Sequence, residues 1–125
     1  MNTPKFIRFW FPVCIYSGII FYVSSLQGDD IPVGVGNIDK LVHVVEYIPF
    51  GFLLCRGLFK NFAHMRMSRL FFFVFLGSFI YGISDEYHQS FVAGRAAEGM
   101  DALADSLGGG LGGFLYILKN KRERS

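Results

Sequence analysis

Four stretches of mostly apolar residues dominate this chain of 125 residues, and each is close to the length that crosses a lipid bilayer. A membrane helix needs about 20 consecutive apolar residues, and a helix satisfies its backbone hydrogen bonds within its own segment. We therefore expect an all-α polytopic membrane protein, folded as a single domain (1–125) with a four-transmembrane-helix bundle. The expected spans are residues 6–26, 41–59, 70–91 and 100–118.

Basic residues alternate with acidic ones along the regions that flank these spans. Basic side chains lie before the first span, between the second and third, and after the fourth, whereas the other two connections are net acidic. Because lysine and arginine concentrate on the cytoplasmic side, we expect the N and C termini to be cytoplasmic. The basic residues are Lys5, Arg8, Arg56, Lys60, Arg66, Arg69, Lys119, Lys121, Arg122 and Arg124.

Two alternative interpretations of the basic residues carry less weight. The first span could be a cleaved signal peptide, but it is long and aromatic, and no small-residue cleavage site follows it. The basic tail is explained by membrane orientation, so no nucleic-acid partner is expected.

Ionisable residues lie inside or at the ends of three of these spans. On a helix, Asp39, His43 and Glu46 fall within an arc of roughly 60°. Asp85, Glu86 and Gln89 end the third span, and Asp101 and Asp105 begin the fourth, one turn apart. A charged side chain at the bilayer centre costs about 2.5–3.5 kcal/mol on insertion scales, so such residues indicate a functional site by default.

The expected topology brings these polar groups to one depth, in the outer third of the bilayer. For Asp39, Glu98 and Asp101, an equal alternative is that they are loop-proximal and hydrated. Glu46 has apolar residues on both sides and therefore needs a partner, a proton or water. We expect His43, one helical turn away, to be its nearest partner.

Glycines in the fourth span predict close helix packing. Gly108 and Gly112 continue the face of Asp101, and Gly109 and Gly113 form a second pair with the same spacing. Small residues four apart let helix backbones approach closely in lipid. We expect these glycines to hold the acidic turn against the second and third spans.

The motifs D-K-L-V-H-V-V-E-Y, S-D-E-Y-H-Q-S-F-V-A-G-R and D-A-L-A-D-S-L-G-G-G-L-G resemble the VanZ-like family of small bacterial membrane proteins. The resemblance covers residues 39–113. Asp105 stands where the family usually has asparagine, and Ala93 where proline is common. The resemblance implies a multi-pass protein of the bacterial cytoplasmic (inner) membrane, and the family's namesake is associated with teicoplanin resistance. The matching positions are Asp39, Lys40, His43, Tyr47, Asp85, Glu86, Gln89, Gly94, Arg95, Asp101, Gly108 and Gly112.

The first functional hypothesis is a site for an anionic membrane lipid or a lipid-linked cell-wall precursor at the outer leaflet. Arg95 would hold a phosphate or carboxylate. Glu86, His43 and Glu46 would act as acid or base if a reaction occurs. The remaining substrate-binding candidates are Gln89, Asp39, Asp85, Asp101 and Tyr47.

No cofactor is required by this hypothesis, but a divalent metal ion is a variant of it. Carboxylates and imidazole are suitable ligands for hard and borderline cations, although the spacing matches no named metal motif. The candidate ligands are His43, Glu46, Asp85, Glu86 and Asp101.

Two other function classes stay open at this point. The polar groups could form a structural network that locks the helix packing, in a protein without enzymatic activity. An ion or proton transporter is a weaker alternative, because no matching polar path continues through F-G-F-L-L or L-F-F-F-V-F-L. The sequence does not determine the oligomeric state.

Overall fold

The chain folds into four α-helices, as the apolar stretches predict. A computed structural model describes residues 4–25, 37–62, 64–92 and 99–124. Within these residues all regular secondary structure is helical. The helices are α1 (Lys5–Ser24), α2 (Asn37–Asn61), α3 (Met67–Gln89) and α4 (Gly99–Arg124).

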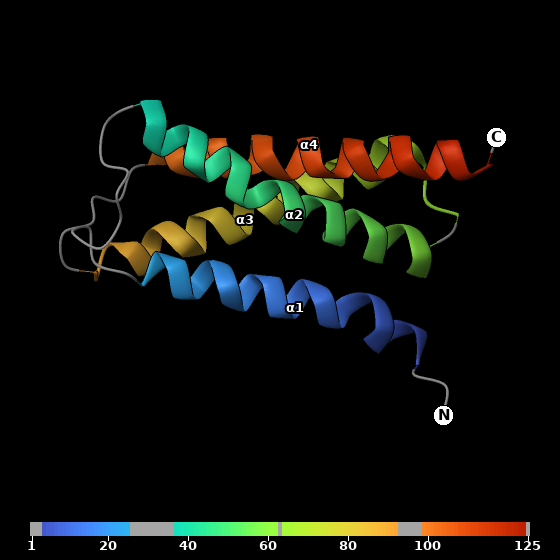
Figure 1. Cartoon of the computed structure of the whole chain (residues 1–125), viewed down its shortest axis with the longest axis horizontal. Coiled ribbons are helices and arrows are strands. Elements are labelled where there is room, and N and C mark those ends of the chain that lie inside the picture. Colours follow the sequence, from blue (N-terminus) through green and yellow to red (C-terminus); the bar gives the residue numbers. More distant parts are fainter. Residues whose placement is uncertain (1–3, 26–36, 63, 93–98, 125) are drawn as a thin grey trace.

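Consecutive helices run in opposite directions, so that α1 begins and α4 ends at the same end of the bundle (Figure 1). The C-terminal ends of α1 and α3 therefore lie at the opposite end, together with the N-terminal ends of α2 and α4. The helix α2 begins at Asn37, four residues before the predicted span. Lys40 thus belongs to the helix, one turn before His43.

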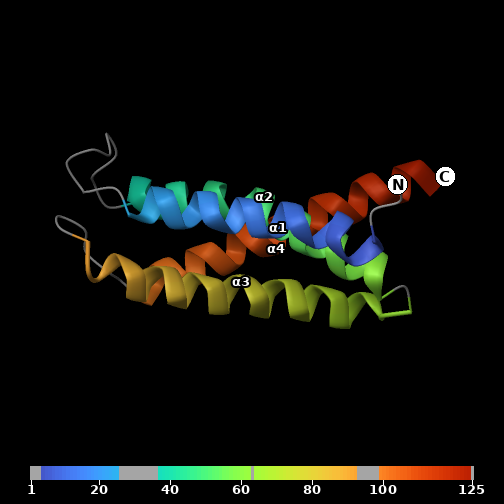
Figure 2. The same ribbon diagram turned by 90° about the horizontal axis from the view of Figure 1, so that it is seen from below.

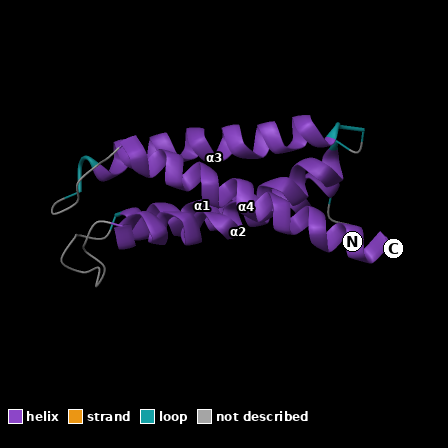
Figure 3. Cartoon of the chain, turned by 90° about the horizontal axis from the view of Figure 1, so that it is seen from above, coloured by secondary structure: helices purple, strands orange, loops and turns teal. Residues whose placement is uncertain are grey.

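The helix α2 contacts all three of the other helices, most extensively α4. The helix α4 also packs against α3, whereas α1 packs mainly against α2 and touches α3 only lightly. Figures 2 and 3 show α3 on the side away from α1 and α2, with α4 crossing obliquely between them. The edge position of α1 leaves room for a groove beside α2.

Three of the helices are long and apolar enough to cross a membrane. Among the described residues these are Lys5–Ser24, Lys40–Asn61 and Met67–Gln89. The sequence analysis expects four such spans, and α4 is not among the three. The reason lies in its inner face, which carries Asp101, Asp105 and Ser106 together with the glycines, all buried against other helices.

The distribution of polarity resembles a membrane protein more than a water-soluble bundle. Large hydrophobic side chains are exposed on all four helices, among them Phe72, Ile80 and Leu107, whereas several ionisable side chains are buried. Contiguous exposed apolar surface of this kind is uncommon on soluble monomers. We conclude that this is a helical protein suited to a lipid environment.

Glycines set the contact between α4 and its two neighbours. A Cβ at Gly108 would collide with the carbonyl oxygen of Val44 on α2, and one at Gly112 would collide with the carbonyl of Ile48. On the adjacent face, a Cβ at Gly109 would overlap Ser78 on α3. One glycine pair thus contacts α2, and the second, which includes Gly113, contacts α3.

The apolar half of the core lies near the end where α1 begins. It combines residues from α2, α3 and α4, and Phe52 packs edge-on against Tyr116 with ring centroids 5.3 Å apart. A second cluster lies between α1 and α2, where Phe50 stacks on Tyr81 of α3. The buried residues of the first cluster are Cys55, Leu70, Val74, Tyr116 and Ile117.

Candidate functional site

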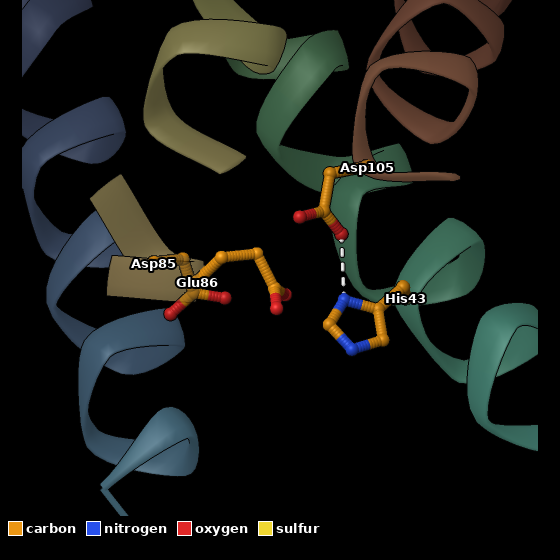
Figure 4. Close-up of side chains that lie close together, drawn as sticks. All are labelled: His43, Asp85, Glu86 and Asp105. Atoms are coloured by element: carbon orange, nitrogen blue, oxygen red, sulfur yellow. Dashed lines mark hydrogen bonds and ion pairs between the residues drawn. The ribbon is translucent and has the colours of Figure 1, made fainter. Parts of the chain in front are cut away.

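Four buried side chains from three helices meet near the end of the bundle where α4 begins. They are His43 of α2, Asp85 and Glu86 of α3, and Asp105 of α4. Each offers one ligand atom, and these atoms all lie within 4.8 Å of one another. Figure 4 shows the four side chains converging from α2, α3 and α4. We call this set the polar cluster.

A histidine–aspartate pair links α2 to α4 at the centre of the polar cluster. The Nδ1 atom of His43 lies 2.8 Å from Oδ1 of Asp105, with both side chains buried. Because an ionised carboxylate can only accept, the imidazole N–H donates this hydrogen bond. Gly82 of α3 makes room for Asp105, since a Cβ at Gly82 would lie 2.8 Å from Oδ2 of the aspartate.

A second aspartate of α4 approaches the other ring nitrogen of His43. Oδ2 of Asp101 lies 3.6 Å from Nε2 of the ring. Oδ1 of the same aspartate lies 3.8 Å from Nζ of Lys40. The Lys40 side chain is 38% exposed, whereas that of Asp101 is 2% exposed. Lys40 therefore reaches from the surface of the bundle to a buried carboxylate, which shows that Asp101 is not a hydrated loop residue.

The inner face of α3 continues this polar environment. Gln89 is buried, and it follows Asp85 by one helical turn. Tyr47, one turn after His43 on α2, is also fully buried. Its hydroxyl has no hydrogen-bond partner among the described residues.

Glu46 lies on a different side of α2 from the polar cluster. It is half-buried and lines a cavity between α1 and α2, where the Tyr16 hydroxyl donates a hydrogen bond to its backbone carbonyl. The sequence pattern predicts His43 as the nearest partner of Glu46. The described contacts of His43 go instead to Asp105 and Asp101, because the ring points toward α4.

The predicted metal-ligand set changes in the structure. His43, Asp85 and Glu86 belong to the group of mutually close ligand atoms, whereas Glu46 and Asp101 do not. Asp105 joins the group instead. The sequence predicts Asp105 as one of the polar residues that converge, one turn after Asp101 on the same face, but Asp105 is absent from the predicted metal ligands.

Two predicted binding residues cannot be placed relative to the polar cluster. Arg95, like Gly94 before it, lies outside the described residues. Asp39 belongs to α2, but its side chain also lies outside the described part of the structure. Among the predicted site residues, those brought together are His43, Tyr47, Asp85, Glu86, Gln89 and Asp101.

An apolar cavity of about 410 Å³ runs beside this site, between α1 and α2. Ile20 at its floor is fully buried, whereas Ile19, Leu41 and Val45 at its rim are exposed. Glu46 is the ionisable carboxylate on its wall. The cavity is lined by Tyr16, Ile19, Ile20, Val23, Leu41, Val42, Val45 and Glu46.

The polar cluster has the chemistry to bind a cation or to exchange a proton. A histidine held by a carboxylate has a fixed orientation, and neighbouring carboxyl groups in an apolar interior can act as acid or base. Together, the apolar exterior, the helical bundle and the buried polar site define the class of this protein. It is a helical membrane protein with a buried polar centre.

The family assignment agrees with this class. The model of the family described as VanZ/LLP1 matches residues 3–120, which is nearly the whole chain. The chain therefore belongs to the VanZ/LLP1 family, as the motif resemblance predicts. No curated protein and no solved structure gives a significant match.

Proposed function

We propose that the chain spans the bacterial inner membrane four times, with both termini in the cytoplasm. The basic residues support this orientation, because Arg8, Arg56, Arg69 and Lys119 belong to helix ends that lie together in the bundle (Figure 1). The polar cluster then lies toward the extracytoplasmic side. It is near the outer leaflet, where envelope lipids and wall precursors are exposed.

The two faces of α4 support its assignment as the fourth span. Its outward face carries exposed apolar side chains, including Leu103, Leu107, Leu111 and Phe114, while its polar residues face α2 and α3. The helix α4 can therefore have a low mean hydropathy and still present an apolar surface to lipid. Intramembrane polar residues are expected to face the bundle interior in this way.

Within this topology, we propose that the site binds an anionic envelope lipid or a lipid-linked cell-wall precursor. The observation that carries the proposal is the position of the buried polar cluster next to an exposed apolar cavity. Ligand sites commonly combine an apolar lining with a few polar groups that fix orientation. A lipid has the same combination of an apolar chain and a polar headgroup.

The cavity between α1 and α2 is suited to the chain of the lipid. Its lining is almost entirely aliphatic, and its rim residues Leu41 and Val45 are exposed on the surface that faces the bilayer. The C-terminal end of α1 and the N-terminal end of α2 border it, at the same end of the bundle as the polar cluster. An acyl or isoprenoid chain in this cavity would keep its headgroup near Lys40.

The headgroup would be bound by the cationic side chains. Lys40 is partly exposed and already forms an ion pair with Asp101, so it can contact an anion without leaving the site. Arg95 would supply a planar, bidentate donor for a phosphate or carboxylate. In a catalytic version, Glu86 and the His43–Asp105 pair would transfer the proton, with Gln89 orienting a water or the headgroup.

A structural role for the polar cluster is the alternative, and the buried His43–Asp105 hydrogen bond supports it. Buried ion pairs can fix a packing arrangement without taking part in chemistry. In that case, each substitution in the cluster would lower the amount of folded protein, and any loss of lipid binding would only follow that loss of folded protein. In the site proposal, Arg95→Ala and Lys40→Gln remove lipid binding from a protein that folds normally.

Lipid analysis of the purified protein tests the proposal. Wild type, Arg95→Ala and Lys40→Gln are purified in a mild detergent, and copurified lipids are quantified by mass spectrometry. We expect both variants to retain at least about tenfold less of an anionic lipid, because each loses a charge-assisted contact. The matched control is Lys60→Gln, which removes one positive charge at the other end of α2.

Two results would overturn the lipid proposal. One is a wild-type preparation that retains no lipid beyond the detergent background. The other is an equal loss in Lys60→Gln, which would indicate a non-specific charge effect. If the lipid is a wall precursor, expression of the protein is also expected to change teicoplanin susceptibility, measured against the Arg95→Ala variant.

A further inference from the structure

We propose that the polar cluster is a binding site for one divalent transition-metal ion with mixed nitrogen and oxygen ligands. The ligands are His43, Asp85, Glu86 and Asp105, which come from α2, α3 and α4. The site does not require the lipid, although a bound ion would also offer a positive charge to an anionic headgroup. Binding of an ion would fasten three helices together within the membrane.

The distances between the ligand atoms are close to those around a bound ion. With metal–ligand bonds of about 2.1 Å, neighbouring ligand atoms in an octahedron lie about 3.0 Å apart and opposite ones about 4.2 Å apart. Nδ1 of His43 and Oδ1 of Asp105 are 2.8 Å apart, and the largest separation within the group is 4.8 Å or less.

Charge balance also favours a dication. The four carboxyl groups of Asp85, Glu86, Asp101 and Asp105 are all buried. The described ion pairs bring two basic side chains to them, Lys40 and His43. Buried carboxylates need counter-charges or bound protons, and a dication held by Asp85, Glu86 and Asp105 would be one such counter-charge.

Two buried oxygen atoms at the cluster provide an independent indication of a ligand. Oδ2 of Asp105 is buried and has no hydrogen-bond partner among the described residues, and the same holds for the hydroxyl of Tyr47. Figure 4 shows this second oxygen of Asp105 on the side that faces Asp85 and Glu86. Buried polar atoms in native structures are nearly always satisfied, and a metal ion or a water bound to it would satisfy both.

The mixture of ligands selects the class of metal. Three carboxylates favour hard cations such as Mg²⁺, Ca²⁺ and Mn²⁺, whereas the imidazole favours transition metals such as Mn²⁺, Fe²⁺ and Zn²⁺. Mn²⁺ accepts both kinds of ligand and is the appropriate probe. Because the proton on Nδ1 of His43 must move to Nε2 or leave the ring before Nδ1 can bind an ion, protonation of the imidazole competes with the metal, and binding should weaken as the pH falls.

Electron paramagnetic resonance provides the direct test, because free Mn²⁺ gives a sharp signal that binding removes. Purified full-length protein in detergent, treated with chelator and then freed of it, is titrated with Mn²⁺. We expect about one Mn²⁺ per chain in wild type. Asp105→Asn and Glu86→Gln should weaken binding at least about tenfold, because each replaces a charged ligand by an amide of similar shape.

The matched control is Glu123→Gln, which makes the same chemical change at the C-terminal end of α4, at the other end of the bundle from the polar cluster. It should bind Mn²⁺ as wild type does. Circular dichroism and the size-exclusion profile establish that each variant is folded, and a Mn²⁺-dependent rise in Tm in wild type but not in Asp105→Asn gives a second readout. The proposal fails if wild type binds no Mn²⁺, or if Glu123→Gln weakens binding as much as Glu86→Gln.

The outcomes for the metal and for the lipid can be separated. Lipid retention is measured on the same chelator-treated protein, before any Mn²⁺ is added. Lipid without Mn²⁺ binding would overturn the metal site and leave the lipid proposal standing. Mn²⁺ binding by a protein that retains no lipid would support the metal site and overturn the lipid proposal.

Discussion

The two halves of this bundle are built from the same three helices, yet their interiors have opposite chemistry. Toward the end where α4 finishes, α2, α3 and α4 contribute Cys55, Val74 and Tyr116 to an apolar core. Toward the other end, the same helices contribute His43, Asp85 and Asp105. Because apolar packing alone can hold these helices together in one half, the charged groups in the other half need another explanation.

The difference between the halves also bears on transport. A route for ions or protons needs polar groups along the whole bundle. In the described residues, the buried core beyond the glycines of α4 is apolar, with Leu70, Val74 and Ile117 at its centre. The polar groups thus form a site that is confined to one half, which favours binding over passage.

Removing the central histidine should produce the largest effect on stability. His43→Leu leaves Asp105 and Asp101 buried without the imidazole, so we expect a loss of about 4 kcal/mol in the free energy of unfolding. The double variant His43→Leu/Asp105→Leu should recover part of this loss, because one stranded carboxylate is removed. The free energy of unfolding of both variants is measured by denaturant titration in detergent. If His43→Leu were as stable as wild type, the charged half of the bundle would not depend on its ion pairs for stability, and the contrast with the apolar half would be wrong.

The next largest effect should come from the boundary between the halves. A Cβ in Gly112→Ala would collide with the carbonyl of Ile48 and force α4 away from α2, at a cost of about 3 kcal/mol. The matched control is Gly110→Ala, whose Cβ would meet only Phe75 at 3.5 Å. Equal unfolding midpoints for the two variants would mean that close approach of α4 to α2 is not required.

The smallest effect should arise in the apolar half. Val74→Ala leaves a small cavity among Cys55, Leu70 and Tyr116, so we expect a loss of about 1 kcal/mol. Mn²⁺ binding and lipid retention should be unchanged, because Val74 lies outside the polar cluster. If this variant lost either ligand, the halves would be coupled, and the separation of a packing region from a binding region would be wrong.

The sequence predicts the helices well because the length of an apolar run is a local property. The four helices begin and end within a few residues of the predicted spans, apart from the longer C-terminal end of α4. The glycine spacing likewise indicates a close packing face, because residues four apart lie on one side of a helix. The structure adds which neighbour each pair contacts.

The partners within the site could not be predicted in the same way. Whether His43 contacts Glu46 on its own helix or Asp105 on another depends on how α2 and α4 are rotated against each other. That rotation is determined by the glycine contacts with Val44 and Ile48, which involve backbone atoms that a residue pattern does not display. The ion pair of Lys40 with Asp101 was not predicted either. Lys40 precedes the apolar run, and only the structure shows that α2 begins early enough to include it.

In the proposed four-span topology, the arrangement of α4, apolar outside and polar inside, has a consequence for how the chain enters the bilayer. As a membrane span, α4 carries two aspartates and a run of glycines, so it would partition poorly into hydrocarbon alone. It follows α2 and α3 in the chain, so both helices can already be inserted during synthesis when α4 leaves the translocon. Its acidic face can then pass directly to His43 and Gly82, which makes insertion of the last helix and assembly of the site a single event.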